Sequence, residues 1–321
     1  MLLHDRLPPP SEPALDRVAS MQAVLAHRIL TTLPAAGDHI SAVPRLTLFR
    51  RDGPCEPASA LYEPSLSLVV QGRKQAILSG HEYAYDPHHF LLTSVDLPTM
   101  SHVIAGTPEQ PFLSLMLKLD LEAVQEISAG IASQSWPANP TGSGMVIGPM
   151  TEELLEPIVR LAALADQPGD IAFMAPLITR EITYRLLTAP VGGWLRSIAM
   201  LGTRCNRIAH VMSWLRENYA RPVRVEDLAG MAGMGVSTFH HHFTGIARMS
   251  PLQFQKQIRL HEARRLLLIE PIDAATAALR VGYESATQFN REYRRLFGNP
   301  PIRDVTTLRI GGDQSMTAST T

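Results

Sequence analysis

The feature that most constrains the fold of this chain is an internal repeat in its C-terminal third. The segment LAGMAGMGVSTFHHHF starts at Leu228, and the segment AALRVGYESATQFNREY starts at Ala277. Equivalent residues lie 49 positions apart before the turn in each segment and 50 positions apart after it, because the second turn has one extra residue. Two copies of one pattern are stronger evidence than either copy alone. The repeat therefore predicts one supersecondary unit that is built twice.

Each copy has the pattern of two helices joined by a tight turn. A small alanine in the first helix allows close packing, and Gly233 or Gly282 can adopt the positive φ that the turn needs. Phe239 and Phe243 are four positions apart in the second helix, so they share its inner face and leave the opposite face outward. Polar groups on that outward face can contact base edges or phosphates of DNA. The predicted contact residues are Ser237, His240 and His241 in the first copy and Ala286, Thr287, Asn290 and Arg291 in the second.

The segment between the copies, residues 251–269, reads as a single helix. Pro251 suits a first helical turn, and Glu270-Pro271 ends the helix. Nineteen residues at 1.5 Å each give a length of about 28 Å. Successive major-groove faces of DNA are roughly 34 Å apart. We therefore expect this helix to hold the two outward faces toward adjacent grooves of one double-stranded duplex.

The charge distribution supports a division of the chain near residue 205. Residues 206–321 carry 15 Lys and Arg and 10 Asp and Glu, a net charge of +5, whereas the remainder carries 14 and 20, a net charge of −6. A basic C-terminal part can approach a phosphate backbone. Cys55 and Cys205 have no companion at metal-ligand spacing, which argues against a disulfide framework or a zinc finger.

The N-terminal part has a different pattern. Between residues 45 and 119, short apolar runs are divided by turn residues such as Asp52-Gly53 and Ser79-Gly80, which indicates several short strands in a barrel or sandwich. Helical patterning returns in residues 154–164 and 171–187 and predicts two antiparallel helices. We expect an α+β chain with a domain at 1–195, helical from about 150, a boundary within 190–205, an all-α double helix-turn-helix domain at 205–308 and a disordered tail at 309–321.

The motifs VEDLAGMAGMGVSTFHHHF, MSPLQFQKQIRLHEARRLLL and VGYESATQFNREYRRLFGNPP together resemble the DNA-binding domain of AraC/XylS-type regulators over residues 207–305. The resemblance implies sequence-specific binding of operator DNA by the seven outward residues named above. One position departs from the family pattern: an arginine is common where His241 stands. A neutral imidazole makes a weaker phosphate contact, so we expect the first copy to bind more weakly or with a dependence on pH.

The stretch LYEPSLSLVVQGRKQAILSGHEYAYDPHHFLLTSVDLPTMSHV resembles the N-terminal domain of one subgroup of AraC-type regulators, a cupin-like β-barrel followed by helices. This resemblance implies a small-molecule effector in the barrel and self-association into a homodimer, with RNA polymerase as a further partner. Polar residues that interrupt the apolar strands are the candidates for the effector pocket, and surface roles remain the alternative for them. They are Tyr62, Glu63, Gln71, Arg73 and Lys74.

A second class of function, a metal-dependent cupin enzyme with an appended DNA-binding domain, stays open at this point. Its candidate ligands are His81, Glu82, His88, His89 and His102. The usual metal-cupin pattern has two histidines one residue apart, and this sequence has no such His-x-His, so we expect no metal, no cofactor and no enzymatic activity. No run of about 18 apolar residues and no signal pattern is present, which predicts a cytoplasmic protein without a membrane segment.

Overall fold

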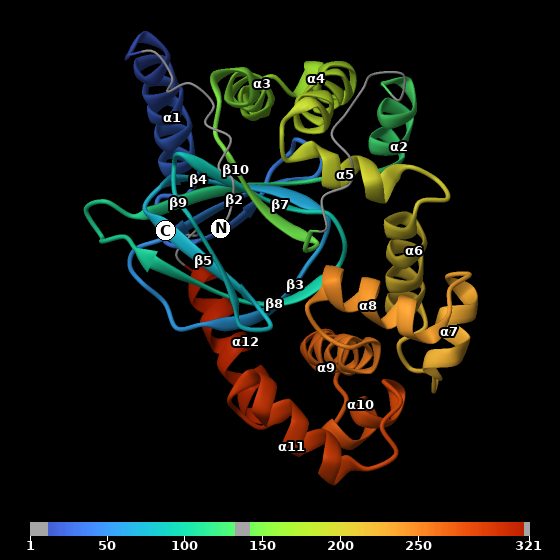
Figure 1. The fold of residues 1–321 in the computed structure, drawn as a ribbon. Helices are drawn as coiled ribbons and strands as arrows, with labels where there is room; N and C mark the ends of the chain where they lie inside the picture. Colours follow the sequence, from blue (N-terminus) through green and yellow to red (C-terminus); the bar gives the residue numbers. More distant parts are fainter. Residues whose placement is uncertain (1–11, 132–141, 318–321) are drawn as a thin grey trace.

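The computed structural model describes residues 12–131 and 142–317, which form a β-rich N-terminal part and a helical C-terminal part (Figure 1). The strands are β1 (Gly37–Ile40), β2 (Leu46–Arg51), β3 (Ala58–Tyr62), β4 (Ser65–Gln71), β5 (Arg73–Leu78), β6 (His81–Tyr85), β7 (His89–Thr93), β8 (Leu97–Ala105), β9 (Phe112–Lys118) and β10 (Met145–Pro149). The helices of this part are α1 (Glu12–Thr32), α2 (Leu121–Gly130), α3 (Glu152–Ala163), α4 (Pro168–Thr188) and α5 (Gly192–Ala199).

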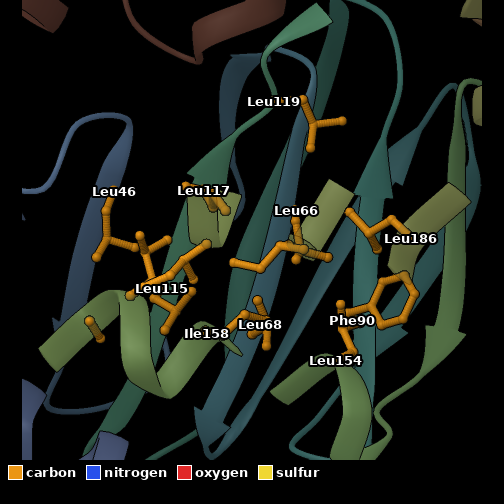
Figure 2. Packing of buried hydrophobic residues seen from close by; sticks show 14 of the residues in the cluster. Leu46, Leu66, Leu68, Phe90, Leu115, Leu117, Leu119, Leu154, Ile158 and Leu186 are labelled. Atoms are coloured by element: carbon orange, nitrogen blue, oxygen red, sulfur yellow. The ribbon is translucent and has the colours of Figure 1, made fainter. Parts of the chain in front are cut away.

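A six-stranded antiparallel sheet, in the order β1-β2-β9-β4-β7-β10, carries the main core on one face. Because side chains alternate along each strand, every second residue points to this face. Leu66 and its paired neighbours Leu92 and Leu117 are almost completely buried there. Helices α1, α3 and α4 cover the face, and Figure 2 shows Leu154, Ile158 and Leu186 of α3 and α4 among the strand leucines. The two helices predicted in residues 154–164 and 171–187 are thus present as α3 and α4, which pack on each other over this sheet.

The other face of the six-stranded sheet looks toward a four-stranded sheet in the order β3-β8-β5-β6. Val69, Leu91, Val103 and Phe112 belong to the apolar cluster between the sheets. The hydroxyl side chains of Ser67, Thr93 and Ser114 also point toward the four-stranded sheet. The predicted β-rich domain is confirmed, but the described strand pairings form two separate sheets and do not close into a barrel.

The C-terminal part consists of helices packed around a central rod. Its elements are α6 (Arg204–Glu217), α7 (Val225–Met231), α8 (Val236–Ala247), α9 (Pro251–Ile269), α10 (Ala274–Arg280), α11 (Ala286–Phe297) and α12 (Pro301–Thr317). The structure differs from the predicted tail, since α12 continues from its packed first turns through residues 309–317. A helix that is already nucleated extends at little cost, because each added residue adds one backbone hydrogen bond.

The two parts share a hydrophobic cluster. Val95 and Met145 from the β-rich part pack with Trp194 of α5 and with Ile246 at the end of α8. The amide of Gly144 also donates a hydrogen bond of 2.9 Å to the carbonyl oxygen of Ile246. The first helix-turn-helix half therefore docks directly on the N-terminal part. Among the residues described, none lies in a helix that combines the length and the apolar character needed to cross a membrane.

Candidate nucleic-acid interface

The first predicted unit is formed by α7, a turn at Gly233 and α8. Gly233 has φ +60°, as the turn requires, and Ala229 is buried at the crossing of the two helices. Phe239 and Phe243 are fully buried with ring centroids 5.5 Å apart, and Phe243 packs edge-on against Phe254 of α9. These aromatic rings fix the inner face of α8, so its opposite face is directed to solvent.

The second unit repeats this arrangement with better capped helices. The Asp273 side chain accepts a hydrogen bond from the Thr276 amide at the start of α10, and Ser285 caps α11 through the Gln288 amide. Phe289 and Tyr293 occupy the same buried positions as the phenylalanine pair of α8. Caps of this kind satisfy amides that a helix leaves without partners. The extra residue in this turn is accommodated before Ser285 without a change in the helices.

Helix α9 joins the units over the residues that the sequence predicts. Ser250 caps it, accepting from the Gln253 amide while the Gln253 side chain accepts from the Ser250 amide, and Pro251 takes the first position. In Figure 1, α8 lies on one side of α9, and α10 and α11 lie on the opposite side. The rod and the two helical pairs of the sequence prediction are confirmed.

The structure places all seven predicted DNA-contacting residues on exposed surface. They are Ser237, His240 and His241 on α8, and Ala286, Thr287, Asn290 and Arg291 on α11. The face of α11 also includes Arg294, which is exposed and lies four positions after Asn290. Helical spacing from Asn290 would have indicated this arginine from the sequence. Its guanidinium adds a positive charge to the same face.

His242 differs from its two neighbours because it is partly buried on the flank of α8. Burial lowers the pKa of His242 below its ordinary value, and the positive charge of Arg204 lowers it further. A cation beside the imidazole disfavours its protonated form. His242 therefore contributes no positive charge to the interface at neutral pH.

The five candidates for the effector pocket do not form a single group. Tyr62 on β3 and Lys74 on β5 lie together, with the Lys74 ammonium 5.6 Å from the centre of the Tyr62 ring. Gln71, the last residue of β4, donates to the Pro111 carbonyl oxygen at 2.8 Å. Arg73 is exposed. Glu63 lies at the contact between the two parts of the chain. The structure adds Tyr85, whose register partner is Lys74 and whose pKa is raised by burial and by the neighbouring Tyr62.

An ion-pair cluster links the β-rich part to α6. The guanidinium of Arg216 pairs with both Asp96 and Glu63, and Lys118 pairs with Glu63 as well. Burial raises the pKa of Asp96 to about 6 although Arg216 opposes the shift. Burial also acts on Glu63, but Lys118 and Arg216 outweigh it and hold the pKa of Glu63 below its ordinary value. Arg216 thus pairs with two carboxylates whose pKa values are shifted in opposite directions.

The histidines that suggested a metal site are dispersed over the β-rich part. His81 and Glu82 are exposed on β6, and the exposed His89 ring pairs with Asp86 at 2.8 Å. His102 lies on β8, in the same four-stranded sheet as β6 and in a different sheet from His89 on β7. Within residues 12–131 and 142–317, no three His, Cys, Asp or Glu side chains gather closely enough to hold a metal ion. The geometry gives no support to the metal-enzyme alternative.

Comparison with known proteins gives two family matches. Residues 42–194 match the family described as AraC-type transcriptional regulator N-terminus, and residues 228–304 match the family described as helix-turn-helix domain. The first match covers the two sheets and helices up to α5, and the second covers both helix-turn-helix units. The two matches occur in the same order as the two parts of the structure.

The relatives include a thermoregulatory protein and a transcriptional activator. The thermoregulatory protein LcrF of Yersinia pestis is 24% identical over 243 residues, which are 74% of this chain and 88% of LcrF. The transcriptional activator RhaS of Salmonella schwarzengrund is 26% identical over 158 residues, 49% of this chain and 55% of RhaS. The chain thus aligns with a little over half the length of RhaS. The crystal structure of ToxT from Vibrio cholerae O395 covers 81% of this chain and 96% of ToxT with a TM-score of 0.54 and 10% identity, which shows a shared fold.

A β-rich N-terminal unit followed by two helix-turn-helix units on one rod defines a DNA-binding transcription regulator. The chain belongs to the AraC/XylS-type regulators.

Proposed function

We propose that this chain recognises a specific operator in double-stranded DNA through the outward faces of α8 and α11. The observation that carries the proposal is that two copies of one unit, joined by α9, both direct polar side chains to solvent. Base contacts come from Ser237, His240 and His241 of the first unit and from Ala286, Thr287, Asn290 and Arg291 of the second. Arg294 and Arg204 supply phosphate contacts at the edges of these faces, since both are exposed and positively charged.

The test is a titration of labelled DNA from the chain's own promoter region with the full-length protein. A regulator binds its operator about 10³-fold or more tighter than random DNA, and its affinity falls steeply with salt as counterions are released. Random DNA of equal length is the matched control. Equal affinity for both DNAs, or no dependence on salt, would contradict the proposal.

A small-molecule effector binds between the two sheets of the N-terminal part, which take a cupin-like arrangement in this proposal. Strand register puts Lys74 and Tyr85 on the side of β5 and β6 that faces the six-stranded sheet, and Tyr62 lies beside them. One cation, two phenols and several hydroxyls among apolar side chains suit an amphiphilic ligand with an acidic group. ToxT, a structural neighbour with a TM-score of 0.54, has been solved bound to (E)-4-(8-methylnaphthalen-1-yl)but-3-enoic acid.

This part of the proposal is tested by thermal unfolding of the full chain with a monounsaturated fatty acid as the probe. Ligand at 100 times its Kd stabilises a protein by about 2.7 kcal/mol. Lys74→Met should abolish the stabilisation. Arg73→Met removes an exposed charge from the preceding position of β5 and should leave the stabilisation unchanged. An equal response of both variants, or no response of the wild type, would contradict an acidic effector at this place.

A homodimer forms through α4, in our proposal. This 21-residue helix buries Ile178 and Ile182 on the core but exposes Phe173 by 78% and Leu177 by 61% on its other side. A helix that is apolar on both faces is generally buried on both. Asp170 and Tyr184 stand seven residues on either side of Leu177. In an antiparallel pair centred on Leu177, each Tyr184 hydroxyl would therefore meet the Asp170 carboxylate of the other copy.

Sedimentation of the full chain tests the dimer. Leu177→Lys should convert it to a monomer, and Leu201→Lys, at a residue that is 84% exposed after α5, should not. Dimers that persist in Leu177→Lys would rule out α4 as the interface. RNA polymerase as a partner and the cytoplasm as the compartment complete the proposal for a regulator of this type.

A further inference from the structure

The two helix-turn-helix halves touch each other directly, apart from their connection through α9. The loop after α6 lies against the glycine turn after α10. Gly282 has φ +87°, and a Cβ added to it would come within 2.3 Å of the Ala220 carbonyl oxygen. Tyr219 packs against the hydrophobic clusters of both halves. The backbone of one half is therefore in van der Waals contact with the backbone of the other.

The side chain of Arg259, in the middle of α9, lies at this contact. Its Nε donates to the Tyr219 carbonyl oxygen at 2.7 Å, and Nη2 donates to the carbonyl oxygens of Ala220 at 3.2 Å and Arg221 at 3.0 Å. Its Nη1 donates to the Gly282 carbonyl oxygen at 2.9 Å. One guanidinium thus holds three carbonyls of the first half and one of the second.

The electrostatics explain why an arginine fits here. Residues 219–221 follow the C-terminal end of α6, and Gly282 follows the C-terminal end of α10. Helix C-termini carry partial negative charge and unpaired carbonyl groups, which a cation stabilises. The planar guanidinium has five donors in a fixed fork, so it can serve two helix ends at once, whereas a lysine ammonium acts as a point charge. Gln255, one turn earlier, adds donations to the carbonyls of residues 219 and 221.

We infer that Arg259 sets the relative position of the recognition helices α8 and α11 and thereby the spacing of the two half-elements in the operator. The inference rests on the proposed DNA-binding function. Packing on α9 positions each helical pair separately, with Phe254 and Ile258 in the cluster of the first pair and Leu260 and Ala263 in the cluster of the second. The bonds of Arg259 tie both pairs to one point and so fix the rotation of one pair relative to the other. Arg259 is thus a positioning residue that needs no contact with DNA.

The experiment begins with DNA selected from a random library by the full-length wild-type protein. Variants of the selected site carry one, two or five additional base pairs between the half-elements, and anisotropy gives the affinity for each. The wild type should lose about tenfold or more on one added base pair, because the second unit then misses base contacts worth roughly 1–3 kcal/mol each. The Arg259→Gln variant should bind the DNA with the selected spacing about tenfold more weakly than the wild type does. Its affinities for the DNAs of the spacing series should differ from one another by less than about threefold. Arg265→Gln is the matched control, since Arg265 is exposed on the same helix and pairs with Glu262 of that helix.

The shape of the spacing profile separates positioning from stability. A loss of affinity that is equal at every spacing, or a profile identical to that of the wild type, would overturn the inference. If Arg259→Gln unfolds below the assay temperature, Arg259→Lys replaces it, because a lysine ammonium cannot serve both helix ends at once, and an unchanged profile in that variant overturns the inference as well. If the wild-type protein enriches no DNA sequence, the proposed function itself is refuted. If the affinities of the wild type and of the variant depend equally on the spacing, only the role of Arg259 is refuted.

Discussion

Replacing Asp96 with Asn should remove a pH dependence from the stability of the contact between the two parts. Asp96 is 9% exposed, and its carboxyl faces Arg216, Glu63 and Lys118. Its pKa of about 6 exceeds the ordinary value of 3.8, so the folded protein holds a proton that the unfolded chain releases between these two pH values. Stability contributed by Asp96 is therefore full at pH below 3.8 and declines as pH rises through 6. The asparagine cannot ionise, but its carbonyl oxygen can still accept from Arg216.

The magnitude follows from the two pKa values. The full difference between 3.8 and about 6 corresponds to roughly 3 kcal/mol at 1.36 kcal/mol per pH unit. Between pH 7.5 and pH 5, linkage gives about 1.4 kcal/mol of that total, because the unfolded carboxyl stays ionised while the folded one becomes protonated. Glu63 does not affect the comparison between pH 5 and pH 7.5. Because its pKa is lowered, its contribution to stability declines only at more acidic pH.

His261 acts in the opposite direction, so wild type and variant must be compared. Burial and the nearby Arg264 lower the pKa of His261 to about 4, and its contribution to stability is therefore lost as pH falls below 6.5. Urea unfolding followed by tryptophan fluorescence at pH 5, 6, 7 and 7.5 gives the difference between wild type and Asp96→Asn, in which His261 cancels. We expect the wild type to gain about 1.4 kcal/mol on the variant from pH 7.5 to pH 5. A difference that stays constant, or that grows with pH, would refute the reasoning, and Glu109→Gln at an exposed carboxylate should give a constant difference.

Three further predictions concern the C-terminal part. Arg291→Ala should weaken binding to the selected operator by about 1–3 kcal/mol in an anisotropy titration, and an equal loss on random DNA would assign Arg291 to a phosphate instead of a base. Gly282→Ala should lower the free energy of unfolding more than Gly298→Ala, because both glycines have positive φ but only at Gly282 would the Cβ meet the Ala220 carbonyl oxygen; equal losses would contradict the contact between the halves. Phe239→Ala should cost about 3–5 kcal/mol of stability in urea unfolding, since the ring is fully buried, and a loss below about 1 kcal/mol would contradict its place in the core.

The helical pairs could be predicted from the sequence because local interactions determine them. The alanine, the glycine and the aromatic pair lie within residues 229–243 in the first copy and 278–293 in the second, and the starts of α8, α9 and α11 follow turn or cap residues that can be read directly. The two copies also check each other. The N-terminal strands could be predicted as a group, but their division into two sheets depends on pairings such as β2 with β9 that join distant segments.

The contact between the two parts could not be predicted from the sequence. Arg216 lies 120 positions from Asp96 and 153 positions from Glu63, and no pattern of spacing relates them. The sequence suggested Glu63 as a pocket residue because it interrupts apolar strands, whereas in the structure its carboxylate pairs with Lys118 and Arg216. A polar residue at a strand end has the same pattern whether it faces a ligand or another domain. Only the packed chain distinguishes the two.

The position of that contact limits how the N-terminal part can act on DNA binding. It docks on the C-terminal end of α6, on the last turn of α8 and on α9, where His261 lies 3.1 Å from the Ser59 hydroxyl. Yet the outward faces of α8 and α11 stay exposed while these contacts are made. The N-terminal part therefore does not mask the recognition faces of its own chain. An effector that moves β3 or the start of β8 would act instead on α6 and α9, the two helices that meet at Arg259, and so on the geometry between the recognition helices.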